Sequence, residues 1–258
     1  MLTPRSDVGS SVNPITKLFP ATVTEQRFVE ELDALHTRRD QASYRDDRET
    51  GHTLSDFTVC EADHELQINI KNAGTRFERA MELVGIAPDD CIPIPAYKAN
   101  AAVERMPNLL YAIAVDYTLA ETLNNLLPDL FSRSETIVWD VLSRFTGAKV
   151  RKAEDAFIWS MVNRHWPEID SAITSVPFHV VSARKSVTIL AKEPKRTPGI
   201  GMRAWGNRAS AEVNVHLSIS EDTTPWSDVA ERIVARGVSD IIEAVNRRRR
   251  EWVYDPEI

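Results

Sequence analysis

Three polar side chains in the first half of the chain have the types and the spacing for metal-assisted hydrolysis. Asp56 is followed after twelve residues by Asn69, and Lys71 lies two positions beyond Asn69. Residues two apart on a β-strand point to the same side of the sheet, so Asn69 and Lys71 share a face if they lie on a strand. Carboxylate and amide oxygens bind hard divalent cations. An ammonium group beside them can stabilise charge that builds on a phosphate.

The elements that must position these residues are two strands joined by a short polar turn. Residues 54–60 (LSDFTVC) and 66–71 (LQINIK) are both rich in strand-forming residues, and the five residues EADHE separate them. In the second segment Leu66, Ile68 and Ile70 alternate with polar residues. The alternation predicts a hairpin with one apolar face toward the core and one face that carries the chemistry.

Further elements are expected on both sides of this hairpin. An amphipathic helix is predicted from Thr24, because Phe28, Leu32 and Leu35 recur at helical spacing. Residues 72–86 predict a second helix that Gly85 closes, and the proline-containing segment 88–100 predicts an extended or edge piece. The apolar run 108–117 predicts a strand covered on both faces. The expected order is helix, strand, strand, helix, extended piece, strand.

The motif pair SDF at 55–57 and INIK at 68–71 resembles the bipartite motif of the PD-(D/E)XK nucleases, the superfamily of most type II restriction endonucleases. The element order from 23 to 117 resembles their αβββαβ core. The resemblance implies a mixed α/β fold and a Mg²⁺-dependent endonuclease, with Mn²⁺ as a possible substitute, that cuts double-stranded DNA. The catalytic residues would be Asp56, Asn69 and Lys71, and the metal ligands would include Asp56 and Asn69.

Two positions depart from the family motif. Ser55 stands where the motif has proline, and that position carries no chemistry. Asn69 stands where the motif has an acidic residue, and an amide oxygen brings no charge to a metal. We therefore expect another carboxylate to compensate. Glu65 lies on the same face of the predicted strand and is taken as a metal ligand; other candidates are Asp63, Glu49, Glu30 and Glu31.

The second half of the chain predicts a helical and β-strand extension. Helices are expected over 119–131, 134–145 and 153–166, strands over 177–183, 186–192 and 211–220, and a helix over 225–250. We expect residues 1–20 to form a loose arm and 21–118 the catalytic core. Residues 119–258 are expected to serve DNA recognition and dimer contacts, packed on the core as one domain.

A basic segment in this second half is interpreted as a DNA contact. Residues 183–208 contain seven lysines and arginines and one acidic residue. An acidic protein that concentrates positive charge in one loop usually has an anionic partner. A solvated hairpin loop is the alternative interpretation. The expected DNA-binding residues are Lys98, Arg184, Lys185, Lys195, Arg196, Arg203 and Arg208.

Composition excludes several classes of protein. The net charge of −7 argues against binding nucleic acid by bulk charge alone. No apolar run reaches bilayer length and the first residues lack a signal-peptide pattern, so a cytoplasmic protein without a membrane partner is expected. The two cysteines are expected to be reduced, and the six histidines lack the spacing of a zinc site.

Three functions remain open. The first is a type II restriction endonuclease, expected to act as a homodimer because two active sites can cut both strands of a symmetric DNA site. The second is a DNA-binding or assembly protein on a nuclease-like scaffold that does not cleave, which Asn69 favours. The third is an enzyme that acts on RNA or on a small phosphate ester.

Overall fold

The computed structural model describes residues 14–48, 54–73, 76–134, 150–173, 177–192 and 214–253. Its internal contacts divide the chain into two compact units. The first comprises Met1–Gln26 and Thr118–Thr174, and the second comprises Arg27–Tyr117 and Ser175–Ile258. The second unit contains the expected hairpin. Strands from both halves of the sequence meet in that unit, because β6 (Phe178–Ser182) of the second half pairs with β5 (Leu110–Ala114) of the first.

A six-stranded mixed sheet forms the centre of the second unit, so the mixed α/β class is confirmed. Its order is β1-β2-β3-β5-β6-β8, and β3 and β5 are parallel whereas every other neighbouring pair is antiparallel. The strands are β1 (Ser43–Asp46), β2 (Phe57–Glu61), β3 (His64–Asn72), β5 (Leu110–Ala114), β6 (Phe178–Ser182) and β8 (Thr224–Pro225).

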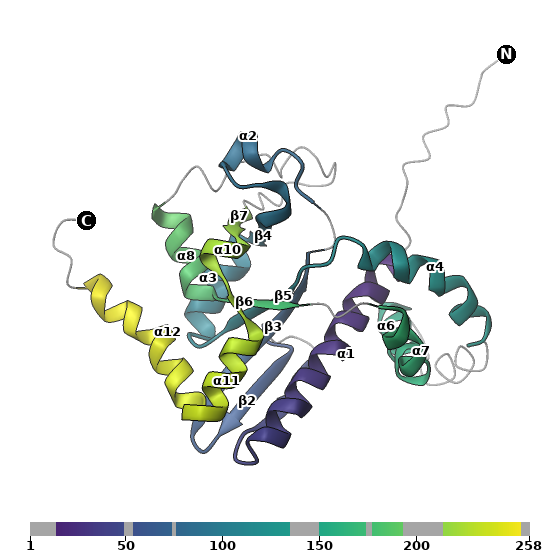
Figure 1. Ribbon diagram of the computed structural model, residues 1–258, viewed down its shortest axis with the longest axis horizontal. Helices are drawn as coiled ribbons and strands as arrows, with labels where there is room; N and C mark the ends of the chain where they lie inside the picture. The colour runs from purple at the N-terminus through teal and green to yellow at the C-terminus, as the bar shows by residue number, and fades with distance from the viewer. Residues whose placement is uncertain are drawn as a thin grey trace. The chain divides into compact units, whose positions relative to one another are not determined.

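The apolar face of the predicted hairpin is confirmed as core. Leu66, Ile68 and Ile70 of β3 are all buried. Phe28 of α1 (Pro14–Arg38) lies on the same core, with its ring centroid 4.9 Å from that of Phe178. Burying one such aromatic side chain contributes about 1.5–3 kcal/mol to folding. The helices α11 (Trp226–Arg236) and α12 (Val238–Val253) follow β8 in this unit (Figure 1).

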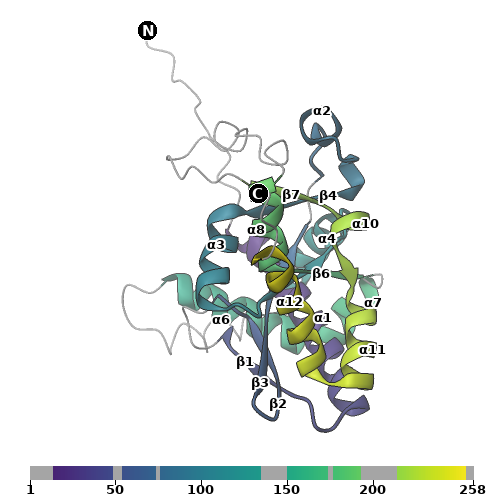
Figure 2. The ribbon, with the colours of Figure 1, turned by 90° about the vertical axis from the view of Figure 1, so that its left-hand side faces the viewer.

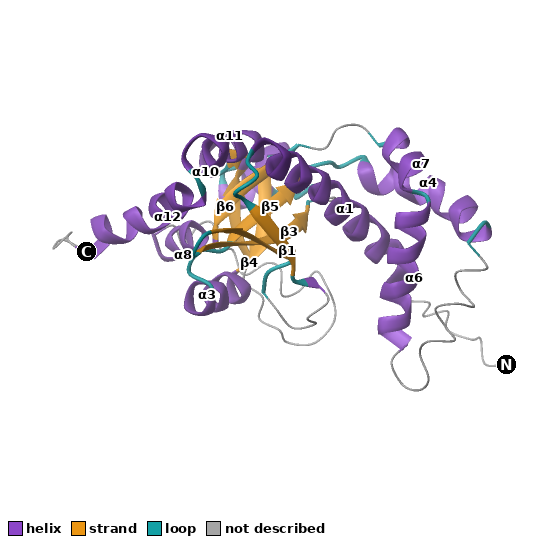
Figure 3. Cartoon of the chain, turned by 90° about the horizontal axis from the view of Figure 1, so that it is seen from below, coloured by secondary structure: helices purple, strands orange, loops and turns teal. Residues whose placement is uncertain are grey.

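A second layer joins α3 (Ala96–Arg105) and α8 (Ala183–Lys192) to a small sheet of two strands. β4 (Cys91–Pro95) pairs antiparallel with β7 (Asn214–Ser218), near α3 and α8 (Figure 2). Seen from below, the strands lie between α11 on one side and α3 with α8 on the other (Figure 3). The cluster behind this layer includes Ala99, Ala102, Tyr111, Ile113 and Ile189. The small alanines of α3 let the helix approach its neighbours closely.

Several expectations about this unit were wrong. Residues 186–192 form part of α8 and not a strand, because Ser186 and Ile189 are buried three positions apart, at helical spacing. Residues 96–100 begin the helix α3, since the prolines that favour an extended chain all precede it. The expected helix 225–250 is two helices that meet at Gly237. The strand expected over 211–220 ends at Ser218, because α10 (Ile219–Asp222) begins at the next residue, and His216 and Ser218 are buried.

Shorter elements complete the second unit. They are α2 (Ala80–Val84), a 3-10 turn η2 (Pro88–Asp90) and α10 (Ile219–Asp222). The helix predicted over 72–86 is shorter than expected, since β3 extends to Asn72 and α2 begins at Ala80. Gly85 ends α2 in the left-handed conformation with φ of 74°, as predicted. The strand β1 was not expected, because its sequence SYRD is polar and gains its order from pairing with β2.

The first unit is helical. It contains α4 (Leu119–Ser132), α6 (Val150–Arg164) and α7 (Trp166–Ala172), which confirms helices over most of 119–131 and 153–166, with a break at His165. The helix α1 begins at Pro14, inside the segment for which a loose arm was expected. The remainder of that arm and the predicted helix from 135 to 145 lie outside the described residues. Among the helices described, none combines the length and apolar character that crossing a bilayer requires.

The junction of α11 and α12 supports a prediction about stability. Gly237 has φ of 90°, and a Cβ built there would lie 2.6 Å from Oε2 of Glu61, which accepts a hydrogen bond of 2.6 Å from the Val238 amide. We expect Gly237→Ala to lower the free energy of unfolding by about 2–4 kcal/mol, through backbone strain and loss of this bond.

Urea unfolding measures this change, and Gly85→Ala is its matched control. Gly85 also has a positive φ, but a Cβ there meets nothing within 4 Å. The control should therefore cost only about 1–2 kcal/mol, the intrinsic strain of a left-handed alanine. Equal losses in both variants would contradict the assigned role of Glu61.

Candidate active site

Asp56 lies immediately before β2 and is held through its backbone and its side chain. Its N–H donates to the Ile68 carbonyl at 2.8 Å, and its carbonyl accepts from the Asp47 N–H at 2.9 Å. One carboxylate oxygen accepts from the Ile70 N–H at 2.6 Å. The Asp56 side chain therefore accepts a hydrogen bond from a β3 amide at the point where β2 begins. This places the Asp56 carboxylate beside the residue that separates Asn69 from Lys71.

Asn69 and Lys71 contact each other on β3. The Lys71 ammonium donates to the Asn69 side-chain oxygen and, at 3.1 Å, to the Ile70 carbonyl. It also lies 5.8 Å from the centre of the Tyr111 ring on the parallel strand β5. Both side chains are half-buried. The amide oxygen at position 69 thus already accepts a hydrogen bond from a cation.

Burial and the Lys71 charge act in opposite directions on Asp56. Burial raises the pKa of the Asp56 carboxyl, whereas Lys71 and the Ile70 N–H lower it, and the pKa ends above its ordinary value of 3.8. The surroundings therefore disfavour the ionised carboxylate relative to water. A bound cation would compensate for that cost.

The structure does not bring Glu65 to this site. Glu65 is exposed, pairs with Arg45 at 3.3 Å and lies opposite Cys60 at the other end of the hairpin. At a rise of ~3.3 Å per residue, four residues of strand separate it from Asn69 by about 13 Å, too far to share one ion. Among the residues that the structure describes, no three His, Cys, Asp or Glu side chains gather in a way that could hold a metal.

The other carboxylates considered for this role also lie elsewhere or are not described. Asp63 is exposed in the turn between β2 and β3, and Glu30 forms an ion pair with Arg27 on α1. Glu31 is half-buried on α1, and Glu49 lies outside the described residues. The carboxylate expected to compensate for Asn69 thus remains a prediction.

The predicted DNA-binding residues divide into described and undescribed ones. Lys98 is half-buried on α3, and Arg184 and Lys185 are half-buried in the first turn of α8. Four more residues lie outside the described parts of the chain: Lys195, Arg196, Arg203 and Arg208.

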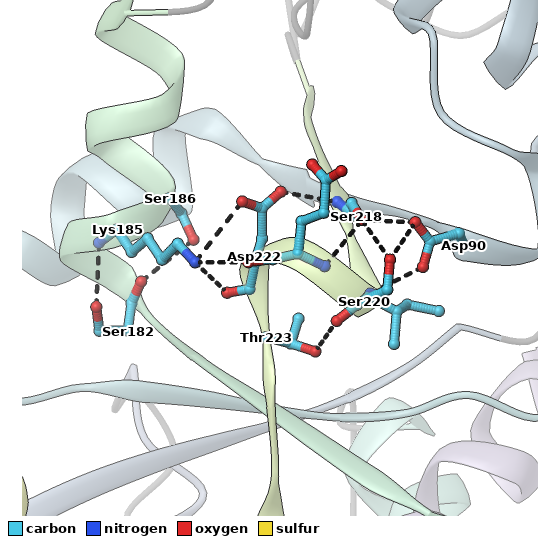
Figure 4. Close-up of polar contacts among 10 residues, drawn as sticks. Asp90, Ser182, Lys185, Ser186, Ser218, Ser220, Asp222 and Thr223 are labelled. Carbon is cyan, nitrogen blue, oxygen red and sulfur yellow. Dashed lines mark hydrogen bonds and ion pairs between the residues drawn. The ribbon is translucent and has the colours of Figure 1, made fainter.

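Lys185 makes contacts at the end of the short helix α10 (Figure 4). Its ammonium donates to the Asp222 carbonyl at 2.8 Å and to the Glu221 carbonyl at 3.3 Å, and it lies 3.7 Å from an Asp222 carboxylate oxygen. Cations are favourable at the C-terminal end of a helix. The positive charge of Lys185 is thus balanced by Asp222 of the same protein, and a DNA phosphate would have to compete with Asp222 for the ammonium group.

A carboxylate on the other side of the same turn completes this network (Figure 4). Asp90 accepts from the Ser218 hydroxyl at 2.5 Å and from the Ser220 N–H at 2.8 Å. Burial raises the pKa of Asp90, but these hydrogen bonds outweigh it, so the pKa lies below its ordinary value. The bonds join η2, which precedes β4, to the turn that follows β7. We infer that this network holds β4 and β7 together.

The residue that sequence reasoning missed near the site is Asp47. It is buried, with only 4% of its surface exposed. It accepts hydrogen bonds from the Ser55 hydroxyl at 2.9 Å, from the Thr58 hydroxyl at 2.5 Å and from Arg45 at 2.7 Å. In the sequence it stands within RDDRE, where no pattern separates a buried aspartate from its solvated neighbours.

Comparison with known proteins adds no assignment: no protein-family model, curated protein or solved structure matches this chain.

Proposed function

We propose that this protein is a metal-dependent endonuclease that hydrolyses phosphodiester bonds of double-stranded DNA. One observation carries the proposal. The Asp56 carboxylate reaches across from the start of β2 to the Ile70 amide, between the Asn69 and Lys71 pair. A carboxylate, an amide oxygen and an ammonium group thus meet at the end of one hairpin.

The order of elements supports the same proposal. The helix α1 precedes three antiparallel strands, β1, β2 and β3, and α3 lies in the chain between β3 and the parallel strand β5. With α2 and β4 inserted, this order is compatible with the αβββαβ core of the nucleases that the motif resembles. The strand β1, which sequence patterns did not indicate, supplies the first strand of that order.

The donor set suits a magnesium ion with few protein ligands. Asp56 and Asn69 would hold it, because Mg²⁺ commonly binds through one or two protein oxygens together with water and substrate phosphate. When bound, the metal would act as a Lewis acid and lower the pKa of a bound water.

Each protein group has a separate part in this proposal. Lys71 orients the attacking water and stabilises the negative charge that grows on the phosphate oxygens. Asp56 supplies the fixed negative charge that attracts the cation to the site. The Ile70 N–H holds the Asp56 carboxylate in place through its 2.6 Å hydrogen bond.

Incubation of purified protein with long duplex DNA and Mg²⁺ tests the proposed activity. Discrete fragments are expected, and they should disappear when EDTA replaces Mg²⁺. We further propose a type II enzyme that acts as a homodimer, since one site per subunit would cut each strand of a symmetric sequence. A protein that leaves unmethylated and methylated duplexes intact with Mg²⁺ and with Mn²⁺ would refute the nuclease proposal.

A DNA-binding protein that does not cleave is the second candidate. The uncharged Asn69 favours it, together with the absence of a three-carboxylate group among the described residues. Gel-shift titration of duplex DNA with EDTA and with Mg²⁺ separates the two candidates. A binding protein should retain DNA equally under both conditions and leave it uncut, whereas the nuclease should release cleaved products when Mg²⁺ is added.

A further inference from the structure

A buried carboxylate beside the candidate site contacts the chain on both sides of Asp56. One oxygen of Asp47 accepts from the hydroxyl of Ser55, which precedes Asp56, and from that of Thr58, which follows it two positions later. The Asp47 N–H also donates to the Asp56 carbonyl at 2.9 Å. Asp47 thus binds the segment that carries Asp56 at three points.

The second oxygen of Asp47 faces a different partner. It accepts a 2.7 Å hydrogen bond from the side chain of Arg45, which is largely exposed. Burial raises the pKa of Asp47, but the hydrogen bonds from Thr58, Arg45 and Ser55 lower it by more than burial raises it. The pKa therefore lies below its ordinary value. The carboxylate is therefore ionised at neutral pH, which makes it a strong and permanent acceptor.

The geometry points to Asp47 as the positioning residue for Asp56: it fixes the backbone on both sides, so that the Asp56 carboxylate stays on the Ile70 amide beside Asn69 and Lys71. The inference rests on the proposed function where cleavage is the readout. Its structural part does not depend on cleavage. A misplacement of about 1 Å in a reacting group can cost about 100-fold in rate, so such a clamp has a measurable effect.

Four variants separate this role from others. Asp47→Ala removes the clamp, whereas Asp47→Asn keeps one carbonyl oxygen that can still accept from Ser55 and Thr58 and loses the charge and the hydrogen bond toward Arg45. Ser55→Ala and Thr58→Val each remove a single hydrogen-bond donor to Asp47. These two variants replace Asp47→Ala in the test if Asp47→Ala does not fold. Asp40→Asn, an exposed aspartate between α1 and β1, is the matched control.

Two readouts are measured on every variant. The first is the kcat and the KM for duplex DNA of Mg²⁺-dependent cleavage. The second is hydrogen exchange at the Ile70 amide, whose acceptor is the Asp56 carboxylate, with the amide of Ile113 in β5 as the reference for global opening.

For Asp47→Ala we expect kcat to fall about 100-fold with KM nearly unchanged, and the Ile70 amide to exchange about tenfold faster while Ile113 stays protected. Asp47→Asn should stay within about threefold of the wild type in both readouts, because the acceptor for the two hydroxyls is retained. Asp40→Asn should stay within the same limit, because Asp40 is exposed and lies outside the clamp. Ser55→Ala and Thr58→Val should fall between these limits.

Two results would overturn the inference. Equal loss of cleavage in Asp47→Asn and Asp47→Ala would mean that the charge itself takes part in the reaction. Unchanged exchange at Ile70 in Asp47→Ala would mean that Asp56 needs no clamp. If the wild type cleaves no DNA, the nuclease proposal fails, and the exchange measurement alone still decides whether Asp47 positions Asp56.

Discussion

Lys71→Met is expected to lower the single-turnover rate of duplex cleavage by about 100- to 1000-fold, the loss typical when one charged or hydrogen-bonding group is removed from a developing anion. Methionine keeps an unbranched apolar stem beside Tyr111 and loses the ammonium that contacts Asn69 and Ile70. The fold should therefore be retained. Rate constants from quenched-flow cleavage with saturating Mg²⁺ measure the effect.

Lys71→Arg gives the informative comparison for this prediction. Arginine keeps the charge but presents a planar, longer group, so we expect partial activity that lies between the wild type and Lys71→Met. Asp63→Asn, in the turn at the other end of the same hairpin, controls for removing a charge near β3. Full activity of Lys71→Met would show that Lys71 only occupies a polar strand face.

Asp56→Asn is expected to abolish cleavage and to stabilise the fold at neutral pH. A metal ligand that loses its charge should cost at least about 100-fold in activity, more than the loss of an outer-shell partner. The fold gains stability because burial, opposed by Lys71, raises the pKa of Asp56 and so disfavours its ionised form. The asparagine carbonyl can still accept from the Ile70 amide. Urea unfolding of both proteins measures the difference.

The pH dependence of this difference follows from the direction of the pKa shift. A carboxyl with a raised pKa binds its proton more tightly in the folded state, so the wild type loses stability as pH rises from the ordinary value of 3.8 through the folded pKa. The advantage of Asp56→Asn should be complete above the folded pKa and should vanish below 3.8. An advantage that persists in acid would contradict this origin.

Sequence patterns predicted those helices and strands that are stabilised mainly by burial of their own side chains. The alternation of Leu66, Ile68 and Ile70 fixed both the strand β3 and its buried face. The strand β1 was missed because SYRD has little apolar surface and depends on its pairing with β2. The segment SVTILAK misled because its β-branched residues favour strands, whereas its burial against α3 has a helical period.

The candidate site was predictable in part for a similar reason. Spacing of two on a strand correctly placed Asn69 and Lys71 together. The five residues EADHE were expected to connect the strands, but the turn contains only Ala62 and Asp63, and the resulting register brings Asp56 to the Ile70 amide. The same rule assigned Glu65 to their face, but alternation gives the face of a residue and not its distance along the strand. Asp47 depends on the register of β1 against β2, which only the folded sheet reveals.

The most direct measurement is Mg²⁺-dependent cleavage of long duplex DNA by the wild type, Asp56→Asn, Lys71→Met and Asp63→Asn, with EDTA as the metal-free reference. Discrete fragments are expected from the wild type and from Asp63→Asn, and intact DNA is expected from the two site variants and in EDTA. Fragments that persist in Asp56→Asn and Lys71→Met would contradict the assigned site. Intact DNA in every lane would contradict the nuclease proposal itself.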